Sequence, residues 1–248
     1  MQTNPIVSRE EWLEARRTLL AHEKEATRLR DKINAERLAM PWVRIDQDYR
    51  FDTPDGRKSL AELFDGRSQL LVYHFMLPPE WEAGCTGCSF LADHLDGAVT
   101  HLNNHDVTLT AISRAPLDHI ERYKRRMGWR FPWASSAGTG FNRDFGVSFS
   151  AEDVAAGATY NYTAPAGAGE MPGMSAFFRD EEDQVFHSYS AYARGIEEWV
   201  GTLMILDRAP LGRNESGTMD WVRRHDEYQA APAAECCGDA RTPATATA

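Results

Sequence analysis

The two residues of this sequence best suited to chemistry are Cys85 and Cys88, which form a CxxC pair. An apolar run at residues 70–76 precedes the pair, and residues 89–103 after it have the pattern of a helix. The N–H groups and dipole at the start of such a helix stabilise a thiolate on the first cysteine. The short spacing keeps the second sulfur close enough to attack a mixed disulfide. We therefore predict a redox-active disulfide in which Cys85 is the catalytic nucleophile and Cys88 is the resolving thiol.

A zinc site is the alternative for the same two cysteines, because structural zinc needs four ligands. Further donors are His94, His101 and His105, on or just after the predicted helix, and the vicinal pair Cys236 and Cys237. None of them forms a second well-spaced pair on an ordered element, and the histidines are explained more simply as residues of the helix surface. We expect no bound cofactor or metal, with zinc as the alternative.

Three further side chains near the dithiol are candidates for a supporting role. Glu82 lies three residues before Cys85 and is either an acid/base that assists Cys88 or an exposed loop carboxylate. Trp81 either packs beside the dithiol or anchors the loop. His74 interrupts the apolar run that leads to the loop. A buried histidine is more often a hydrogen-bonded core residue than a catalyst, and a proton relay is the alternative.

The elements around the dithiol predict a parallel sheet with helices on its faces. Residues 70–76 are apolar except at the histidine, as expected of a central strand that is covered on both faces. Residues 107–113 alternate as a second strand, and a helix follows over 116–127. Such a run of strand, CxxC turn, helix, strand and helix is typical of an α/β protein. The remaining predicted elements are a short helix, a hairpin joined by an acidic turn, and a last helix: 59–64, 175–179 with 185–189, and 196–206.

The chain divides into three regions. Ser8 and Glu11 form a capping box that opens a long helix, and Pro41 ends it, so residues 8–40 are a helical arm. Its apolar seam at seven-residue spacing packs along the same chain or, alternatively, against a second copy in a homodimer. Residues 41–228 form the main domain, with a glycine-rich insertion at about 135–169 that contains a short helix. Residues 229–248 have the composition of a disordered tail.

The amino-acid composition limits which binding partners and which cellular compartment we expect for this protein. The chain has 27 Lys and Arg residues against 37 Asp and Glu residues, a formal net charge of −10. This balance argues against nucleic-acid binding, which requires a basic surface. No apolar run approaches the roughly 18 residues needed to span a membrane, and the first residues lack the pattern of a secretory signal. We expect a cytoplasmic protein with reduced cysteines and with neither nucleic acid nor membrane as a partner.

Residues 49–132 resemble the front half of thioredoxin-like and peroxiredoxin-like proteins, in the Pro54-Asp55-Gly56 turn, the apolar strand, Trp81 and the CxxC at a helix start. More narrowly, the chain resembles the bacterial DUF899 family, described as predicted dithiol-disulfide oxidoreductases. The matching stretches span most of the chain: 11–16, 85–90, 177–180, 186–195 and 221–228. The resemblance implies a thioredoxin-like central sheet flanked by helices and a thiol-disulfide oxidoreductase, whose partners are a disulfide-containing substrate and an external thiol reductant.

Two positions depart from the wider families. Peroxiredoxins share a threonine three residues before the reactive cysteine. This chain has Glu82 at that position. An ionised carboxylate there repels a thiolate, so thiol peroxidase activity ranks below disulfide exchange. Thioredoxins resemble one another in a proline before the strand that faces the CxxC. We expect that position near Ser175, three residues after Pro172, which implies an altered substrate-binding edge.

Overall fold

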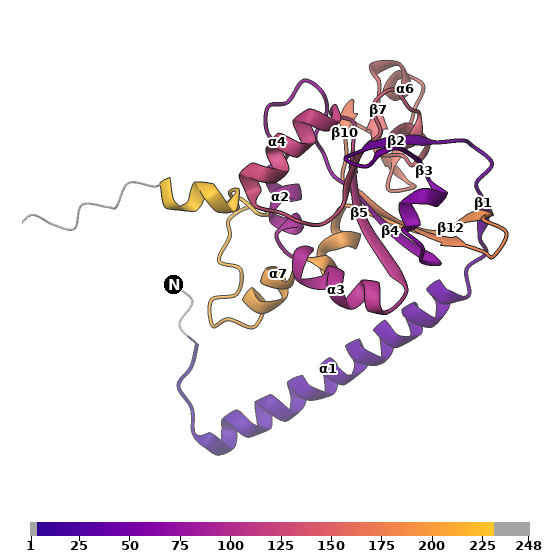
Figure 1. Cartoon of the computed structure of the whole chain (residues 1–248). Helices are drawn as coiled ribbons and strands as arrows, with labels where there is room; N and C mark the ends of the chain where they lie inside the picture. Colours follow the sequence, from indigo (N-terminus) through magenta and orange to yellow (C-terminus); the bar gives the residue numbers. More distant parts are fainter. Residues whose placement is uncertain (1–3, 231–248) are drawn as a thin grey trace, which may run out of the picture.

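An eight-stranded mixed sheet forms the centre of the protein in the computed structural model, which describes residues 4–230 (Figure 1). Its strands lie in the order β1-β12-β11-β4-β5-β6-β2-β3. Strands β4, β5 and β6 are parallel, and the other pairings in this sheet are antiparallel. In chain order its strands are β1 (Val43–Arg44), β2 (Arg50–Thr53), β3 (Gly56–Ser59), β4 (Gln69–His74), β5 (Val107–Ser113), β6 (Trp133–Ser135), β11 (Gly173–Arg179) and β12 (Val185–Tyr192).

Helices and short strands surround the sheet. The helices, with η for a 3₁₀-helix, are α1 (Arg9–Leu38), η1 (Ala61–Phe64), α2 (Thr86–Ala92), α3 (Asp96–Asn104), α4 (Leu117–Met127), α5 (Phe141–Asp144), α6 (Ala151–Ala155), η2 (Ala193–Trp199), α7 (Gly201–Leu206) and η3 (His225–Ala230). Four short strands pair outside the main sheet: β7 (Ser148–Phe149) with β10 (Gly169–Glu170), and β8 (Thr159–Tyr160) with β9 (Ala164–Pro165).

The pairing around β4 defines the fold. Strand β4 continues through α2 and α3 into the parallel strand β5, and the hairpin β11–β12 then places β11 antiparallel on the other side of β4. The resulting order β5-β4-β11-β12 is the thioredoxin-like arrangement. The predicted fold class is therefore confirmed, together with the central strand and the hairpin. Every residue of β5 is buried, as expected of a strand with helices on both faces.

The helix predicted over residues 89–103 is divided into α2 and α3. The chain turns at residues 93–95, where two aspartate side chains accept hydrogen bonds from the segment after α4. Asp93 accepts from the Trp129 indole N–H at 2.8 Å, and Asp96 accepts from the Phe131 N–H at 2.8 Å. These long-range contacts hold the turn against the local helical pattern. The predicted last helix is likewise divided, into η2 and α7.

Two apolar clusters fill the space on the two faces of the sheet. One lies under α2 and α4 and contains Tyr73, Phe75 and Cys88. The other lies under η1 and α5 and contains Phe141 and Phe145 among others. Successive side chains of a strand point to opposite faces. Tyr73 at the end of β4 therefore faces the dithiol, and the next residue of the strand faces away from it.

That next residue, His74, belongs to a chain of buried polar groups on the far face. Its Nε2 lies 2.8 Å from Ser175 Oγ, which lies 2.7 Å from Ser190 Oγ, and His187 Nε2 lies 2.8 Å from the same Ser190 oxygen. Burial, and to a smaller extent the nearby His187, lower the pKa of His74 to about 3, so the ring is neutral. The core interpretation is confirmed, and the alternative of a proton relay to the dithiol is wrong because the sheet separates the two.

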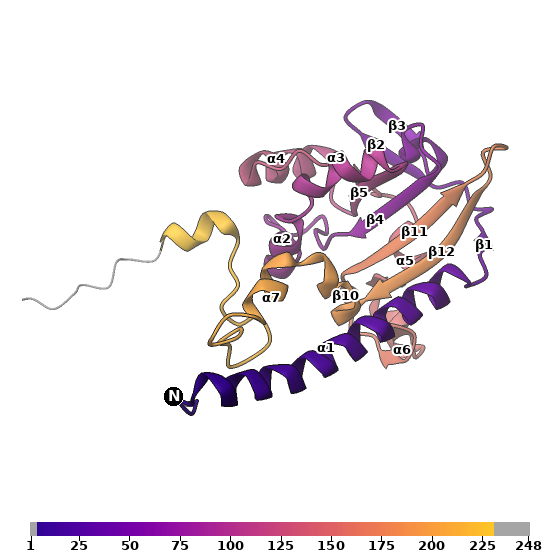
Figure 2. The same cartoon turned by 90° about the horizontal axis from the view of Figure 1, so that it is seen from below.

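The arm α1 begins at the predicted capping box, in which Ser8 and Glu11 each accept from the other's backbone N–H. None of its residues is buried, and its seam residues Trp12, Leu29 and Ile33 are exposed. Figure 1 shows it as an arm that extends past α3 and α7, and Figure 2 shows the same arm from below. Within residues 4–230, no helix combines the length and apolar character needed to cross a membrane.

The glycine-rich insertion carries short elements, including α6 at the place where a short helix is predicted. The region predicted as a disordered tail begins inside η3, and its remainder from residue 231 lies outside the described residues, together with Cys236 and Cys237.

Ser175→Ala tests the contribution of the buried hydrogen bonds around His74. His74 Nδ1 has no hydrogen-bond partner within residues 4–230, so this change leaves the ring without a protein hydrogen bond in the apolar core. We expect the free energy of unfolding, measured in urea, to fall by about 1–3 kcal/mol. Ser188→Ala is the control, because the Ser188 hydroxyl donates to Ala176 O in a half-buried position, and should cost less than about 1 kcal/mol. Equal losses for the two variants would contradict this account.

Candidate active site

Both cysteines of the CxxC pair stand at the start of α2, just beyond the carboxyl end of β4. Cys85 is the N-cap residue of α2, and its N–H donates to Met76 O at 3.1 Å, which fixes the loop against the end of the strand. Cys85 is half-buried, whereas Cys88, one turn into the helix, is only 2% exposed. Both thiols are free. The geometry thus presents one sulfur to a reactant and keeps the other behind it.

The pKa of Cys85 is lowered to about 6. The largest cause is a hydrogen bond from the Cys88 thiol. Burial opposes this effect, and the N–H groups of Cys88 and Gly87 and the charge of Arg224 lower the pKa further. Cys85 is therefore mostly ionised at neutral pH. Burial raises the pKa of Cys88 well above its usual value, and its contact with Cys85 raises it again, so Cys88 stays a thiol.

Tyr73 is a part of this site that sequence reasoning missed. It projects from β4 onto the face that carries Cys88 and is 1% exposed. Its hydroxyl is a hydrogen-bond partner of the Cys88 sulfur and lowers the pKa of Cys88, against the effect of burial. His74, for which the sequence favoured a core role, is its neighbour on the strand and points the other way. The last three residues of β4 are all buried, so the sequence pattern assigns no side to Tyr73 and only the structure identifies it.

Arg224 ties the distant C-terminal segment to the CxxC loop. Its Nε and Nη2 donate to Gly84 O at 3.1 and 2.6 Å, and Nε also donates to the Tyr123 hydroxyl at 3.1 Å. That hydroxyl lies 2.8 Å from Ser89 Oγ, which donates to Cys85 O at 2.8 Å. A closed set of hydrogen bonds therefore links Arg224, α4 and α2 to the backbone on both sides of the nucleophile.

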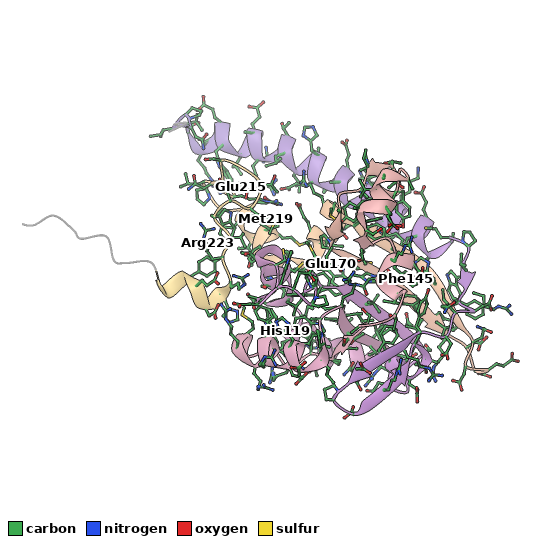
Figure 3. The ribbon with its side chains drawn as sticks, turned by 90° about the horizontal axis from the view of Figure 1, so that it is seen from above. His119, Phe145, Glu170, Glu215, Met219 and Arg223 are labelled. Atoms are coloured by element: carbon green, nitrogen blue, oxygen red, sulfur yellow. The ribbon has the colours of Figure 1, made fainter. Side chains whose placement is uncertain are left out.

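Packing and ion pairs hold the C-terminal segment in this position. The Trp221 ring meets Phe90 of α2 edge-on at 5.5 Å, and Val222 is buried beside it. Further along, Arg126 of α4 pairs with Asp226 at 2.8 Å. Figure 3 labels Glu215, Met219 and Arg223 along this segment. The sequence marks the stretch only through its family resemblance, because nothing local in it indicates contact with residues about 140 positions earlier.

The structure brings Cys85 and Cys88 together but leaves the other two predicted site residues outside their cavity. Trp81 and Glu82 are exposed and line a separate hollow of about 420 Å³ beside α4. The Glu82 carbonyl oxygen lies 3.2 Å from His119 Nε2. A supporting role for these two residues stays a prediction.

The zinc alternative finds no built site in the described part of the chain. Across residues 4–230, no three His, Cys, Asp or Glu side chains gather in a way that suits a metal ion. His94, one of the candidate ligands, instead bonds within the protein through both ring nitrogens, to Phe90 O and to Thr202 Oγ1, each at 2.8 Å.

The position of the proline opposite the dithiol is corrected by the structure. Pro172 directly precedes β11 and lines the cavity that contains the two cysteines. Ser175, the position expected from the sequence, lies inside β11 and bonds His74 on the far face. The expectation was wrong because β11 begins at Gly173, two residues earlier than the apolar pattern indicates.

A family model described as "Bacterial protein of unknown function (DUF899)" matches residues 1–228 of the chain. The chain belongs to the DUF899 family. No curated protein matches it.

Among solved structures, this DUF899 protein is similar to peroxidoxin BcpB from Mycobacterium tuberculosis, with 13% identity, 67% of this chain and 97% of the other covered, and a TM-score of 0.44. A mutant of PrxQ from Xylella fastidiosa has 12% identity, coverages of 66% and 94%, and a TM-score of 0.44. Peroxiredoxin Q from Xanthomonas campestris has 15% identity, coverages of 65% and 91%, and a TM-score of 0.40. At this level of similarity, the fold assignment depends on the strand order described above.

Arg224→Met tests the electrostatic contribution of the C-terminal segment. We expect the pKa of Cys85 in this DUF899 protein to rise from about 6 by about 0.5–1, because a nearby cation is removed from a thiolate. The measurement is the pH dependence of Cys85 alkylation. Arg223→Met is the matched control, since within residues 4–230 the Arg223 guanidinium donates to the carbonyls of Asp220 and Val222 and to no group of the CxxC loop. A pKa that does not move in Arg224→Met, or that moves equally in both variants, would contradict the assignment.

Gly84→Ala tests the close approach of the loop. A Cβ at this position would lie 2.6 Å from Phe75 Cζ and 2.8 Å from Tyr123 Cε1, both core atoms. We expect a loss of about 1–3 kcal/mol in the free energy of unfolding. At Gly87 a Cβ would come no nearer than 3.4 Å, to the flexible Met219 Cε, so Gly87→Ala should be nearly neutral. Chemical denaturation of the two variants checks this, and equal stabilities would refute it.

Proposed function

We propose that this DUF899 protein is a thiol-disulfide oxidoreductase. The observation that carries the proposal is the asymmetry of the pair at the start of α2. Cys85 is accessible with a pKa lowered to about 6, and Cys88 is buried with a raised pKa. A nucleophile needs its thiolate at neutral pH, whereas a resolving thiol must stay protonated until the mixed disulfide has formed. The two environments match these two roles.

The proposed reaction has two exchange steps. The Cys85 thiolate attacks one sulfur of a substrate disulfide R–S–S–R, so that a Cys85–S–S–R bond forms and one RS⁻ leaves. Cys88 then loses its proton to the departing thiolate and attacks Cys85 Sγ, which releases the second RS⁻. The Cys85–Cys88 disulfide has formed, two electrons have passed to the substrate, and one RSH and one RS⁻ result; the RS⁻ takes its proton from the solvent. An external thiol reductant returns the disulfide to the dithiol by the reverse steps.

The surroundings of Cys85 support exchange over the two alternatives. Glu82 is exposed on a separate hollow, so the position of the peroxiredoxin threonine supplies no hydroxyl beside the thiolate. A thiol peroxidase and a zinc module both remain distinguishable by experiment. The first consumes peroxide through a Cys85 sulfenic acid, and the second loses stoichiometric zinc in Cys85→Ala.

Cys88→Ser, in a Cys236→Ser/Cys237→Ser background, tests the proposal. Cys85 is then the only thiol in the chain, and its mixed disulfide with a substrate lacks a resolving partner. We expect this adduct to accumulate to about one per chain, measured by intact mass, whereas the same background with Cys88 restored releases it. In the background with Cys88 intact, the rate at which Cys85 reacts should be half-maximal near pH 6 and level off above pH 7, because the Cys85 pKa is about 6 when the Cys88 thiol is present.

Cys85→Ser in the same background is the control and should form no adduct. Absence of any Cys85 adduct with disulfides, together with no disulfide reductase activity in the unaltered chain, would overturn the proposal.

A further inference from the structure

A cavity of about 250 Å³ adjoins both sulfurs of the pair. It lies between the start of α2, the end of β4, and the η2–α7 region, and the segment at residues 218–219 forms part of its rim. Apart from the thiols, its walls are mainly apolar: Tyr73, Leu91, Ile196, Val200, Leu203 and Met219. The first five of these side chains are at least nine-tenths buried. The space is therefore an open hollow whose floor is made of core side chains.

The charged residues at this cavity neutralise each other. Arg194 and Glu197 both line it, and they pair with each other at 3.0 Å. Arg213 adds a second contact to Glu197 at 3.5 Å. A charged substituent on a ligand would therefore find no free countercharge from this pair, and its loss of hydration would be uncompensated. The site favours a neutral ligand.

The walls also disfavour a peptide. A polypeptide backbone brings one N–H and one C=O per residue, and each costs free energy if it is buried without a partner. The cavity's walls offer few groups that could pair with them. An aryl or alkyl group has no such requirement and gains free energy from contact with apolar walls. By size, a 150 Å³ apolar cavity accepts benzene, so this cavity has room for a somewhat larger group.

We propose that this cavity is the substrate site and that the substrate is a small, neutral organic disulfide with an aryl or alkyl arm. This inference rests on the proposed function, because it adds the substrate class to the same exchange reaction. The arm occupies the cavity, and its sulfur then meets Cys85 Sγ at the cavity wall. The steps and the electron balance are those given above: the first half of the substrate leaves as a thiol after it takes the Cys88 proton, and the arm in the cavity leaves second, as a thiolate that takes its proton from the solvent.

The test compares two disulfides on the full chain in the Cys236→Ser/Cys237→Ser background. Dibenzyl disulfide carries apolar arms and bis(2-hydroxyethyl) disulfide carries polar ones. For each disulfide, the rate constant of its reaction with Cys85 is divided by the rate constant of its reaction with a simple alkyl thiolate. This normalisation removes the difference in intrinsic reactivity between the two disulfides. We expect the normalised value to be about tenfold or more higher for dibenzyl disulfide. Equal normalised values overturn the substrate class.

A filled cavity should abolish this preference. Thr218 is exposed at the rim, so Thr218→Trp can place an indole in the space without a change in the core. We expect the ratio between the two probes to fall to about one, while alkylation of Cys85 by iodoacetamide stays within about twofold. Ser216→Trp, an exposed position of the same segment outside the cavity, is the matched control and should keep the preference. A preference that survives Thr218→Trp overturns the assignment to this cavity.

Bibenzyl, which joins the two benzyl groups of dibenzyl disulfide directly and has no sulfur, separates this inference from the proposed function. Its binding is measured by thermal shift and competition with dibenzyl disulfide. Bibenzyl binding that Thr218→Trp removes, with no disulfide exchange by Cys85, overturns the proposed function and leaves an apolar ligand site. Exchange with both disulfides at equal normalised rates, without bibenzyl binding, leaves the function standing and overturns the substrate class.

Discussion

The hydrogen bond between the buried Cys88 thiol and the Cys85 sulfur is the contact on which the character of this site depends. It is the largest cause of the low pKa of Cys85 and, from the other side, one of the causes of the high pKa of Cys88. The contact exists only because α2 begins at the dithiol and turns the second sulfur inward. Any change that rotates the start of α2 alters both thiols together.

The frame around α2 explains why its start is held so firmly. The strand β4 fixes the loop through the contact of Cys85 with Met76, and the C-terminal segment fixes it from outside through Arg224 and Gly84. Segments from the beginning, middle and end of the domain therefore meet at one short helix. A fold with a central parallel pair of strands places this meeting point at the carboxyl end of the sheet, where α/β proteins generally bind ligands.

Local patterns predicted the central strand, the hairpin, the capping box of α1 and the CxxC pair, because each depends on residues close together in the sequence. The division between α2 and α3 was not predictable, since the Trp129 indole N–H and the Phe131 backbone N–H, both distant in the sequence, hold the turn at Asp93 and Asp96. Tyr73 was missed because an apolar strand buried on both faces gives no alternation from which to assign a side. Arg224 was missed because its partner Gly84 contributes only a backbone oxygen, which leaves no mark in the sequence.

The buried His74 also limits the pH range over which this chain stays folded. The imidazole has a pKa of about 3 in the folded protein and an ordinary value near 6.5 in the unfolded chain. Below about pH 6.5 His74 is protonated in the unfolded chain but stays neutral in the folded one. Each further drop of one pH unit therefore lowers the free energy of unfolding by roughly 1 kcal/mol. Cys85, with a pKa of about 6, loses its charge at the upper end of the same interval. Acidification therefore lowers the stability of the fold and also protonates the Cys85 thiolate, although a sheet separates His74 from Cys85.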